Sequence, residues 1–98
     1  MPQKPKSVPF KTDSINQLPN NKPVVYKLEN QGGDTVYAGI AKRGRVQDRL
    51  KEHLPSGKDP IPSVKKVKIQ QVSSIQEAQK REQGIISRSK PKYNKRGK

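Results

Sequence analysis

One stretch of the chain limits its fold more than any other. Residues 23–41 read "PVVYKLENQGGDTVYAGIA", two runs rich in β-branched and aromatic residues on either side of a Gly-Gly pair. Glycine accepts the positive φ angles that turn a chain back on itself, so this stretch predicts a β-hairpin with strands over 23–30 and 35–41. Two of the chain's four aromatic residues, Tyr26 and Tyr37, fall on the two arms of this hairpin.

Further along the chain, the pattern predicts a helix and then a third strand. Val46, Leu50 and Leu54 recur at the spacing of one helix face, which predicts a helix over 45–54. The three prolines and the glycine of "PSGKDPIPS" end this helix. The alternation of apolar and polar residues in "VKKVKIQQV", residues 64–72, then predicts a strand.

A second helix is predicted over 75–89, because Ser74 and Glu77 form a capping-box pattern before it and Pro91 follows it. The order of elements is therefore strand, strand, helix, strand, helix. This order is typical of an α+β domain, here a small three-stranded antiparallel sheet flanked by helices.

The sequence divides into one domain and two flanking segments. The predicted domain covers residues 23–94, and residues 95–98 form a basic C-terminal tail. Residues 1–22 are rich in proline, which predicts an extended arm or linker. The larger apolar residues of this arm can still dock on the domain: Val8, Phe10, Ile15 and Leu18.

The charge of the chain indicates its partner. Twenty-two Lys and Arg residues against eight Asp and Glu residues give a net charge of +14, which attracts polyanions such as nucleic acid. The absence of cysteine excludes disulfides, thiolate metal sites and cysteine nucleophiles. The chain has neither a run of about 18 apolar residues nor a basic amphipathic helix, so no membrane partner is expected.

The first residues, "MPQKPKSVPFK", carry positive charge without the apolar core of a signal peptide. We therefore expect a cytoplasmic protein, or a secreted effector or toxin domain if the chain has been cut from a longer one. In the second case an acidic inhibitor or immunity protein is the expected partner.

One acidic residue lies where a charge is not expected. The apolar residues of the second helix fall within one arc at about 100° per residue, and Glu82 falls inside that arc. A carboxylate on a buried stripe needs a cation, a metal or hydrogen bonds to compensate it. A salt bridge to a core arginine and a functional role are both open.

The first helix carries a basic pair. Arg49 and His53 are four residues apart, which places them side by side at the edge of the apolar stripe. Together they can bind one phosphate, the arginine through its planar guanidinium. The alternative is that both side chains belong to a solvated face.

The two hairpin tyrosines are predicted to face different surroundings. Tyr37 lies on the strand face opposite Val36 and Ala38, away from the expected apolar face. The neighbouring Gly39 leaves room for a ligand or another backbone to approach closely. Tyr26 alternates with apolar residues, so core packing is the simpler interpretation of its position.

Taken in order, these features resemble the GIY-YIG nuclease domain. The matching parts are two tripeptides on the first two strands, an arginine and a histidine on the next helix, a glutamate on a later helix and a P-x-Y-N segment: "VVY" at 24–26, "YAG" at 37–39, Arg49, His53, Glu82 and "PKYN" at 91–94. The resemblance covers residues 23–94 and includes all three tyrosines, the third being Tyr93. It implies a metal-dependent endonuclease that hydrolyses phosphodiester bonds of nucleic acid.

The resemblance also implies a role for each residue of the site. Glu82 would hold one divalent metal, Mg²⁺ or else Mn²⁺, and Arg49 would clamp a phosphate oxygen as charge builds on it. Tyr26 is expected to act as the base for water with a pKa lowered by neighbouring cations, although which tyrosine is the base is open. Tyr37 would orient water or phosphate, and His53 would position the phosphate or relay a proton.

The chain departs from the family at Ile40, where several relatives have a lysine, so Lys42 or Arg43 is expected to contact phosphate instead. The predicted nucleic-acid contacts are basic or polar side chains near the site and in the tail: Lys42, Arg43, Arg45, Asn94, Lys95 and Arg96. We expect DNA rather than RNA, with low sequence specificity because phosphate contacts carry no sequence information. The alternative is a non-catalytic, basic nucleic-acid-binding module of ribosomal or architectural type, which explains the charge but not Glu82.

Overall fold

The predicted hairpin forms the centre of the fold. In the computed structural model, β2 (Val24–Glu29) runs antiparallel to β3 (Thr35–Ala41). Gly33 turns the chain between them with a φ of +90°, a conformation that glycine adopts without steric cost. The structure describes most of the chain, namely residues 6–55, 57–58 and 60–91.

The sheet has four strands, so the predicted number of three is wrong. The expected third strand is present as β4 (Lys66–Gln71), which pairs with β2. The additional strand, β1 (Lys6–Pro9), pairs with the other side of β4, and the order across the antiparallel sheet is β1-β4-β2-β3. The prolines around β1 concealed it, because proline is depleted in central strands but tolerated in an edge strand such as this one.

The segment between β1 and β2 packs on the domain, as its apolar residues allowed. It contains one helical turn, α1 (Thr12–Ile15). The side chains of Ile15 and Leu18 are buried in the main hydrophobic core. Two residues that the sequence suggested for docking therefore stabilise the fold by burial.

The main core lies between the sheet and α2 (Val46–Glu52), with α1 beside that helix. Val46 and Leu50 of α2 are fully buried there, as the spacing of the apolar residues predicted. The helix is shorter than the predicted range of 45–54, although Leu54 is still buried just after its end.

The other face of the sheet is covered by α3 (Ile75–Ser89), which has the predicted bounds. Ser74 caps its start, with its side-chain oxygen accepting a hydrogen bond of 3.2 Å from the Glu77 N–H. The Glu77 carboxylate accepts a hydrogen bond of 2.8 Å from the hydroxyl of Ser73. Lys90 ends the helix in the left-handed conformation, as is common after a last turn.

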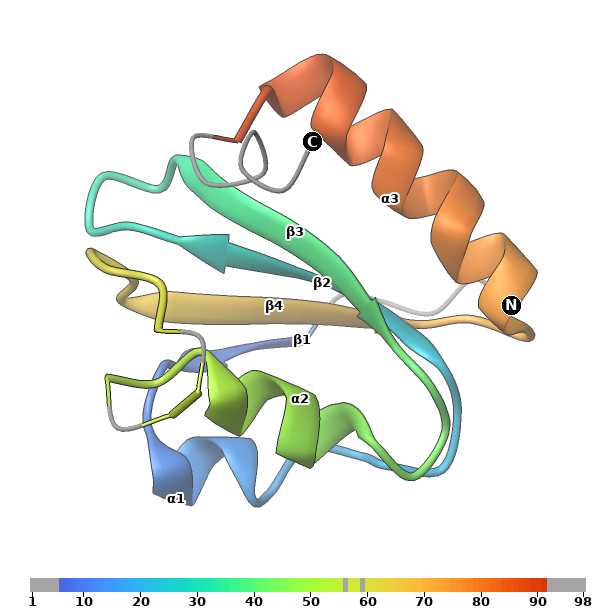
Figure 1. The fold of residues 1–98 in the computed structure, drawn as a ribbon, viewed down its shortest axis with the longest axis horizontal. Coiled ribbons are helices and arrows are strands. Elements are labelled where there is room, and N and C mark those ends of the chain that lie inside the picture. Colours follow the sequence, from blue (N-terminus) through green and yellow to red (C-terminus); the bar gives the residue numbers. More distant parts are fainter. Residues whose placement is uncertain (1–5, 56, 59, 92–98) are drawn as a thin grey trace.

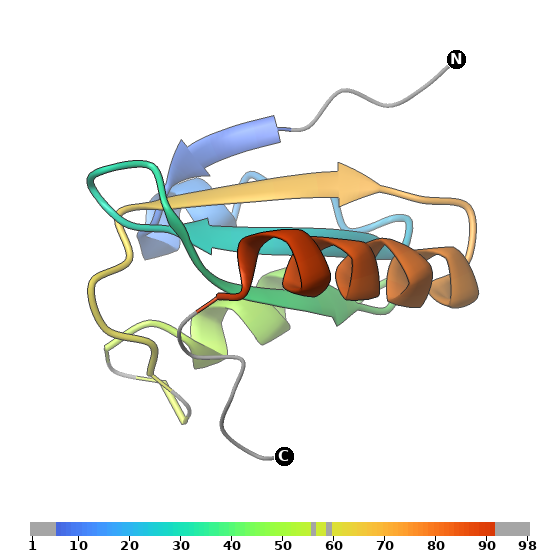
Figure 2. The same cartoon turned by 90° about the horizontal axis from the view of Figure 1, so that it is seen from above.

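The domain therefore has three layers. Figure 1 shows α1 and α2 on one side of the sheet and α3 on the other. Seen from above in Figure 2, α3 lies over β2 and β3, and leaves β4 and β1 uncovered on its side. No helix among the described residues is long and apolar enough to cross a membrane.

Candidate active site

A buried pair of polar side chains lies inside the main core. Tyr26 points from the middle of β2 towards α2, and its hydroxyl oxygen lies 2.9 Å from Nε2 of His53. His53 is the residue that ends α2, and both side chains are almost completely buried, with exposed fractions of 0% and 1%. Each satisfies a polar atom of the other, which offsets the cost of removing both from water.

Gly39 makes room for Tyr26. The two residues are directly opposite each other in the β2–β3 register. A Cβ atom at position 39 would lie 2.5 Å from the hydroxyl oxygen of Tyr26 and 2.6 Å from the ring carbon that carries it. The space that the sequence analysis assigned to a ligand or another backbone is therefore filled by the tyrosine ring.

Tyr37 lies on the strand face opposite Ala38, as predicted, but this face carries Tyr26 and the main core, so the expectation that Tyr37 points away from the apolar face is wrong. Its ring centroid is 6.3 Å from that of Tyr26 and 4.9 Å from that of His53. The register shifts at Val36, which interrupts the simple alternation along β3. Helices also cover both faces of the sheet, so the face with Ala38 was not the single apolar face that the sequence suggested.

Arg49 and His53 have different surroundings, although their spacing suggested that they lie side by side at the edge of one helix face. The histidine turns into the core, whereas the Arg49 side chain is 45% exposed and donates a hydrogen bond of 3.0 Å from Nη1 to Glu52 Oε1. Partial burial lowers the pKa of Arg49, but the influence of Tyr26, Glu52 and Tyr37 outweighs it and raises that pKa. Sequence reasoning missed Glu52 as the partner of Arg49, although the spacing of three residues was a usable signal.

The pKa of Tyr26 moves in the direction opposite to the one expected. Burial raises it most strongly, and the charges of Tyr37, Glu82 and Glu52 raise it further. Among the described residues, Arg49 alone lowers it. With the chain's own groups alone, Tyr26 therefore keeps its proton at neutral pH, because an anion inside a core loses its solvation.

Glu82 reaches the same site from α3. Its side chain is half-buried, and its charge acts on the pKa of Tyr26. The described residues form no group of three or more His, Cys, Asp or Glu side chains that could hold a metal. Among the described residues, Glu82 and Glu52 are the two carboxylates whose charges act on Tyr26.

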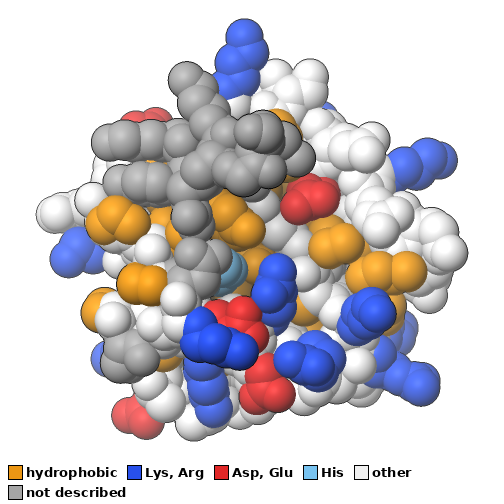
Figure 3. Space-filling model, in the orientation of Figure 1, with side chains coloured by type: hydrophobic (Ala, Val, Ile, Leu, Met, Phe, Trp, Pro, Cys, Tyr) orange, Lys and Arg blue, Asp and Glu red, His pale blue; other side chains and the backbone are white. Residues whose placement is uncertain are grey.

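Three basic residues that were predicted to contact nucleic acid lie at the start of α2, and Arg45 is one helical turn before Arg49. Lys42, Arg43 and Arg45 are exposed in the loop before α2, and Arg45 is 3.8 Å from Asp48. Seven residues of helix separate this loop from His53, a distance of about 10 Å along the axis. In Figure 3, Lys, Arg, Asp and Glu side chains lie below and to the right of the small pale-blue patch, which belongs to the chain's single histidine.

The C-terminal part of the predicted site lies mostly beyond the residues that the structure describes. Tyr93 and three expected nucleic-acid contacts, Asn94, Lys95 and Arg96, lie outside the described residues. Pro91, which opens the "PKYN" segment, is described and fully buried.

Comparison with known proteins points to one protein family. The model of one protein family, the GIY-YIG catalytic domain, matches residues 22–94. Among solved structures, the chain is similar to the GIY-YIG N-terminal endonuclease domain of UvrC from Thermotoga maritima bound to its catalytic divalent cation, magnesium. The TM-score is 0.64, with 27% sequence identity over 81% of this chain and 93% of that chain.

Two point mutants of that domain, each bound to the catalytic divalent cation, are also similar to this chain. One replaces an asparagine by alanine (TM-score 0.63, 27% identity, 81% of this chain and 92% of that chain). The other replaces a tyrosine by phenylalanine (TM-score 0.65, 27% identity, 81% and 93%). None of the curated protein sequences matches the chain. Because the family match spans most of the chain and includes every described residue of the site, the chain belongs to the GIY-YIG family and is a GIY-YIG-type endonuclease domain.

Proposed function

We propose that this domain hydrolyses phosphodiester bonds of DNA with a divalent metal and with low sequence specificity. The observation that carries the proposal is the buried hydrogen bond between Tyr26 and His53. Arg49 and Glu82 are both close enough to act on the pKa of Tyr26, so a cation, a carboxylate and a proton-transfer pair meet at one place. These are the groups that phosphodiester hydrolysis needs.

The side chains fit a magnesium ion. Mg²⁺ prefers oxygen ligands, keeps several of its waters and is commonly bound by one or two carboxylates together with phosphate oxygens. Glu82 offers one half-buried carboxylate of this kind, and the described residues offer no larger group of metal-binding side chains. When bound, the ion would neutralise the phosphate and stabilise the leaving 3′ oxygen.

Tyr26 and His53 activate the attacking water together. The raised pKa of Tyr26 means that its oxygen is protonated before the reaction, so it cannot act as a preformed anionic base. The hydroxyl instead passes its proton to Nε2 of His53 while its oxygen takes a proton from the water. Because Tyr26 is fully buried, this step requires the site to open around the bound phosphate.

Arg49 supplies the positive charge on the phosphate. Its present partner is Glu52, through a surface ion pair of a kind that contributes little to stability. A phosphate can therefore replace Glu52 and receive two parallel hydrogen bonds from the guanidinium. Tyr37 is only half-buried and packs beside His53, which suits it to orient the water or the phosphate.

The use of an external water favours DNA as the substrate. RNA carries a 2′-hydroxyl that can itself attack the neighbouring phosphate, whereas DNA requires a nucleophile from outside. A site that combines a proton-transfer pair with a metal ligand can activate a water molecule as this external nucleophile. Low specificity follows because the exposed cations Lys42, Arg43 and Arg45 contact phosphates, which do not identify a sequence.

Cleavage of a supercoiled plasmid tests the proposal. We expect nicked and linear products with Mg²⁺, no products with EDTA, and cut ends scattered over the sequence. Glu82→Ala should abolish cleavage while DNA binding is unchanged or tighter, because one negative charge is lost. Asp48→Ala is the matched control, since it removes an exposed carboxylate from α2 and should cleave like the parent.

Two results would contradict the proposal. Cleavage by Glu82→Ala at the rate of the parent would exclude this residue as the metal ligand. Binding of the plasmid without any cleavage in Mg²⁺ or Mn²⁺ would favour the non-catalytic binding module instead.

A further inference from the structure

A groove lies on the face of the sheet opposite to Tyr26 and His53. Among the described residues, α3 packs mainly on β2 and β3, so it leaves the sheet beyond β2 largely uncovered on this side (Figure 2). The space between α3 and the uncovered part of the sheet is a groove of about 310 Å³, at the lower end of the range for ligand pockets.

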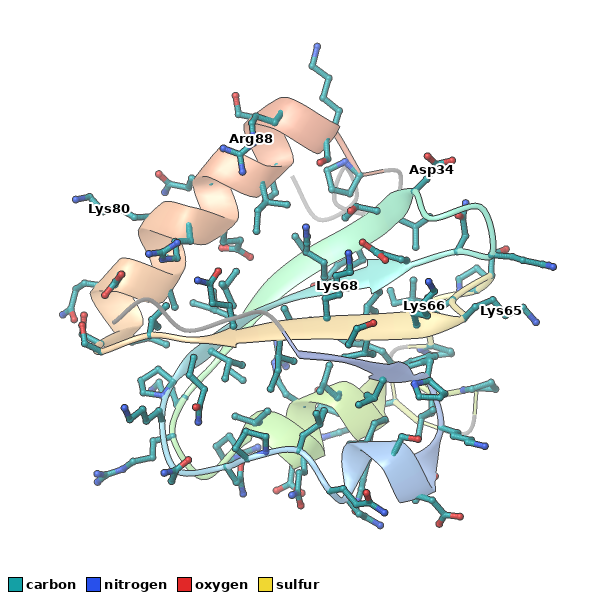
Figure 4. All side chains as sticks on the ribbon, turned by 180° about the vertical axis from the view of Figure 1, so that it is seen from behind. Asp34, Lys65, Lys66, Lys68, Lys80 and Arg88 are labelled. Carbon is teal, nitrogen blue, oxygen red and sulfur yellow. The ribbon has the colours of Figure 1, made fainter. Side chains whose placement is uncertain are left out.

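The groove has an apolar floor and a basic rim. Val25 from β2 and Ile85 from α3 lie in the floor, with exposed fractions of only 3% and 8%. Five cations from β2, β4 and α3 line it: Lys27, Lys68, Lys80, Arg81 and Arg88. Figure 4 shows Lys68 on the sheet below α3, with Lys80 and Arg88 on the helix above it.

Most of this positive charge is not neutralised by ion pairs within the described part of the chain. Lys68 pairs with Glu29 at 3.4 Å, and one guanidinium nitrogen of Arg81 lies 3.1 Å from Glu77. The other three cations of the rim make no ion pair with any residue of the described ranges. Two of the five cations are paired, so three unpaired positive charges remain along the groove. This excess of positive charge favours the binding of an anion.

Gly84 lines the groove without a side chain that would project into it. It lies within α3, where glycine is less favourable than alanine. Packing does not require it, because a Cβ atom at this position would meet nothing closer than Nη1 of Arg88 at 3.8 Å. Because glycine has no side chain, the space between the helix and the sheet stays open here, beside the basic rim.

We propose that this groove binds single-stranded nucleic acid, as a second site separate from the active site. A duplex is a stiff cylinder whose phosphates would reach the rim but not the buried floor. A single strand can set its phosphates against the cations and cover Val25 and Ile85 with a base. None of the described residues that line the groove is aromatic, so we expect low sequence preference.

Both sites can be occupied at once because α3 separates them. At about 100° per residue, Glu82 and Gly84 point in directions roughly 160° apart around the helix. Glu82 belongs to the active site, whereas Gly84 lines the groove. A flexible strand extending from a duplex in the active site can therefore turn around the molecule and enter the groove, whereas the duplex itself is too stiff to do so.

Binding of a fluorescent oligothymidine in EDTA tests the proposal independently of cleavage. Lys80→Gln combined with Arg88→Gln should weaken binding at least tenfold at low salt. The slope of log K against log salt should become shallower by about 1.4, at about 0.7 for each lost phosphate contact. The control, Lys11→Gln with Lys65→Gln, removes the same charge from two exposed residues outside the groove.

A control variant that loses as much affinity as the groove variant would overturn the proposal, because bulk charge would then explain binding. Equal competition by polyglutamate and by the oligonucleotide at matched charge would overturn it too, in favour of an acidic peptide. Plasmid cleavage by the groove variant should remain at the level of the parent, so failure of this proposal and failure of the proposed nuclease activity are distinguishable.

Gly84→Leu locates the binding site. Leucine favours the helix but fills the groove, so we expect a loss of oligonucleotide affinity of tenfold or more without loss of folding. The control Gln83→Leu places the same side chain on the neighbouring exposed position and should bind like the parent. In the parent, the methyl NMR signals of Ile85 and Val25 should shift when the oligonucleotide is added. Unshifted signals, or a Gly84→Leu variant that binds normally, would show that the strand lies elsewhere.

Discussion

The hydroxyl of Tyr26 lies 2.9 Å from Nε2 of His53, and the two side chains are enclosed together in the core of the domain. A residue from the middle of a strand and a residue from the end of a helix, 27 positions apart, therefore form one polar unit. Burial raises the pKa of the tyrosine, so its hydroxyl keeps its proton at neutral pH. This relationship leads to the first prediction.

Tyr26→Phe and His53→Ala should each lower the single-turnover cleavage rate by about 100-fold or more, as expected for a group that transfers a proton. If the two residues act as one unit, the double variant should be no slower than the slower single variant. Losses that multiply in the double variant would show two independent roles. Circular dichroism checks that each variant is folded.

Gly39→Ala should disturb the same pair from the neighbouring strand. The new methyl group would lie 2.5 Å from the Tyr26 hydroxyl oxygen, so the ring must move away from His53. We expect a loss of about 1–3 kcal/mol in the free energy of unfolding, together with a large loss of cleavage rate. Gly32→Ala is the control, because its nearest contact would be Asn30 Oδ1 at 3.5 Å. Equal behaviour of the two variants in urea unfolding would contradict the prediction.

Arg49→Lys should damage the enzyme although it keeps the charge. Lysine cannot make the two parallel hydrogen bonds that a guanidinium makes to phosphate, so we expect the turnover rate to fall by about 100-fold with less effect on binding. Glu52→Gln should leave the rate at least as high as in the parent, because it removes the carboxylate that now holds Arg49. A slow Glu52→Gln variant would mean that this ion pair positions the arginine for catalysis.

The stability of the domain should fall more steeply at alkaline pH when Tyr26 is present. Its folded-state pKa is raised above the ordinary value of 10.0, so the folded state holds this proton more tightly than the unfolded state does. The resulting stabilisation is complete below about pH 10 and is lost as the pH rises beyond that value. Melting temperatures of the parent and Tyr26→Phe, measured from about pH 8 to about pH 11, should therefore converge. Parallel curves would contradict the raised pKa.

The sequence correctly predicted the secondary-structure elements that neighbouring residues determine, such as turn and capping residues. The Gly-Gly turn was sufficient for the hairpin, and Ser74 with Glu77 marked the start of α3 correctly. The strand β1 was missed because its pairing with β4 joins residues about 60 positions apart and no local pattern reports such a contact. Proline-rich composition pointed to a linker in the same place.

The candidate site was predictable in its membership but not in its geometry. The order of motifs brought Tyr26, His53 and Glu82 together through the family resemblance. Which residue is buried, however, depends on how α2 ends against the sheet. Spacing alone placed His53 beside Arg49 on one helix face, whereas the structure turns it inward to Tyr26.

The strand β1, which was not predicted from the sequence, also hinders edge-to-edge pairing of the sheet with other copies of the domain. Phe10, just after β1, donates its N–H to Lys65 O at 3.0 Å, so the backbone nitrogen of the preceding residue, Pro9, faces outwards. Proline has no N–H there, and an approaching strand meets a gap in the row of donors at the rim of the sheet. A shortened chain that lacks β1 would instead leave the backbone of β4 bare along Lys66–Ile69. Such a chain would be prone to polymerise by strand addition, with its catalytic residues unchanged.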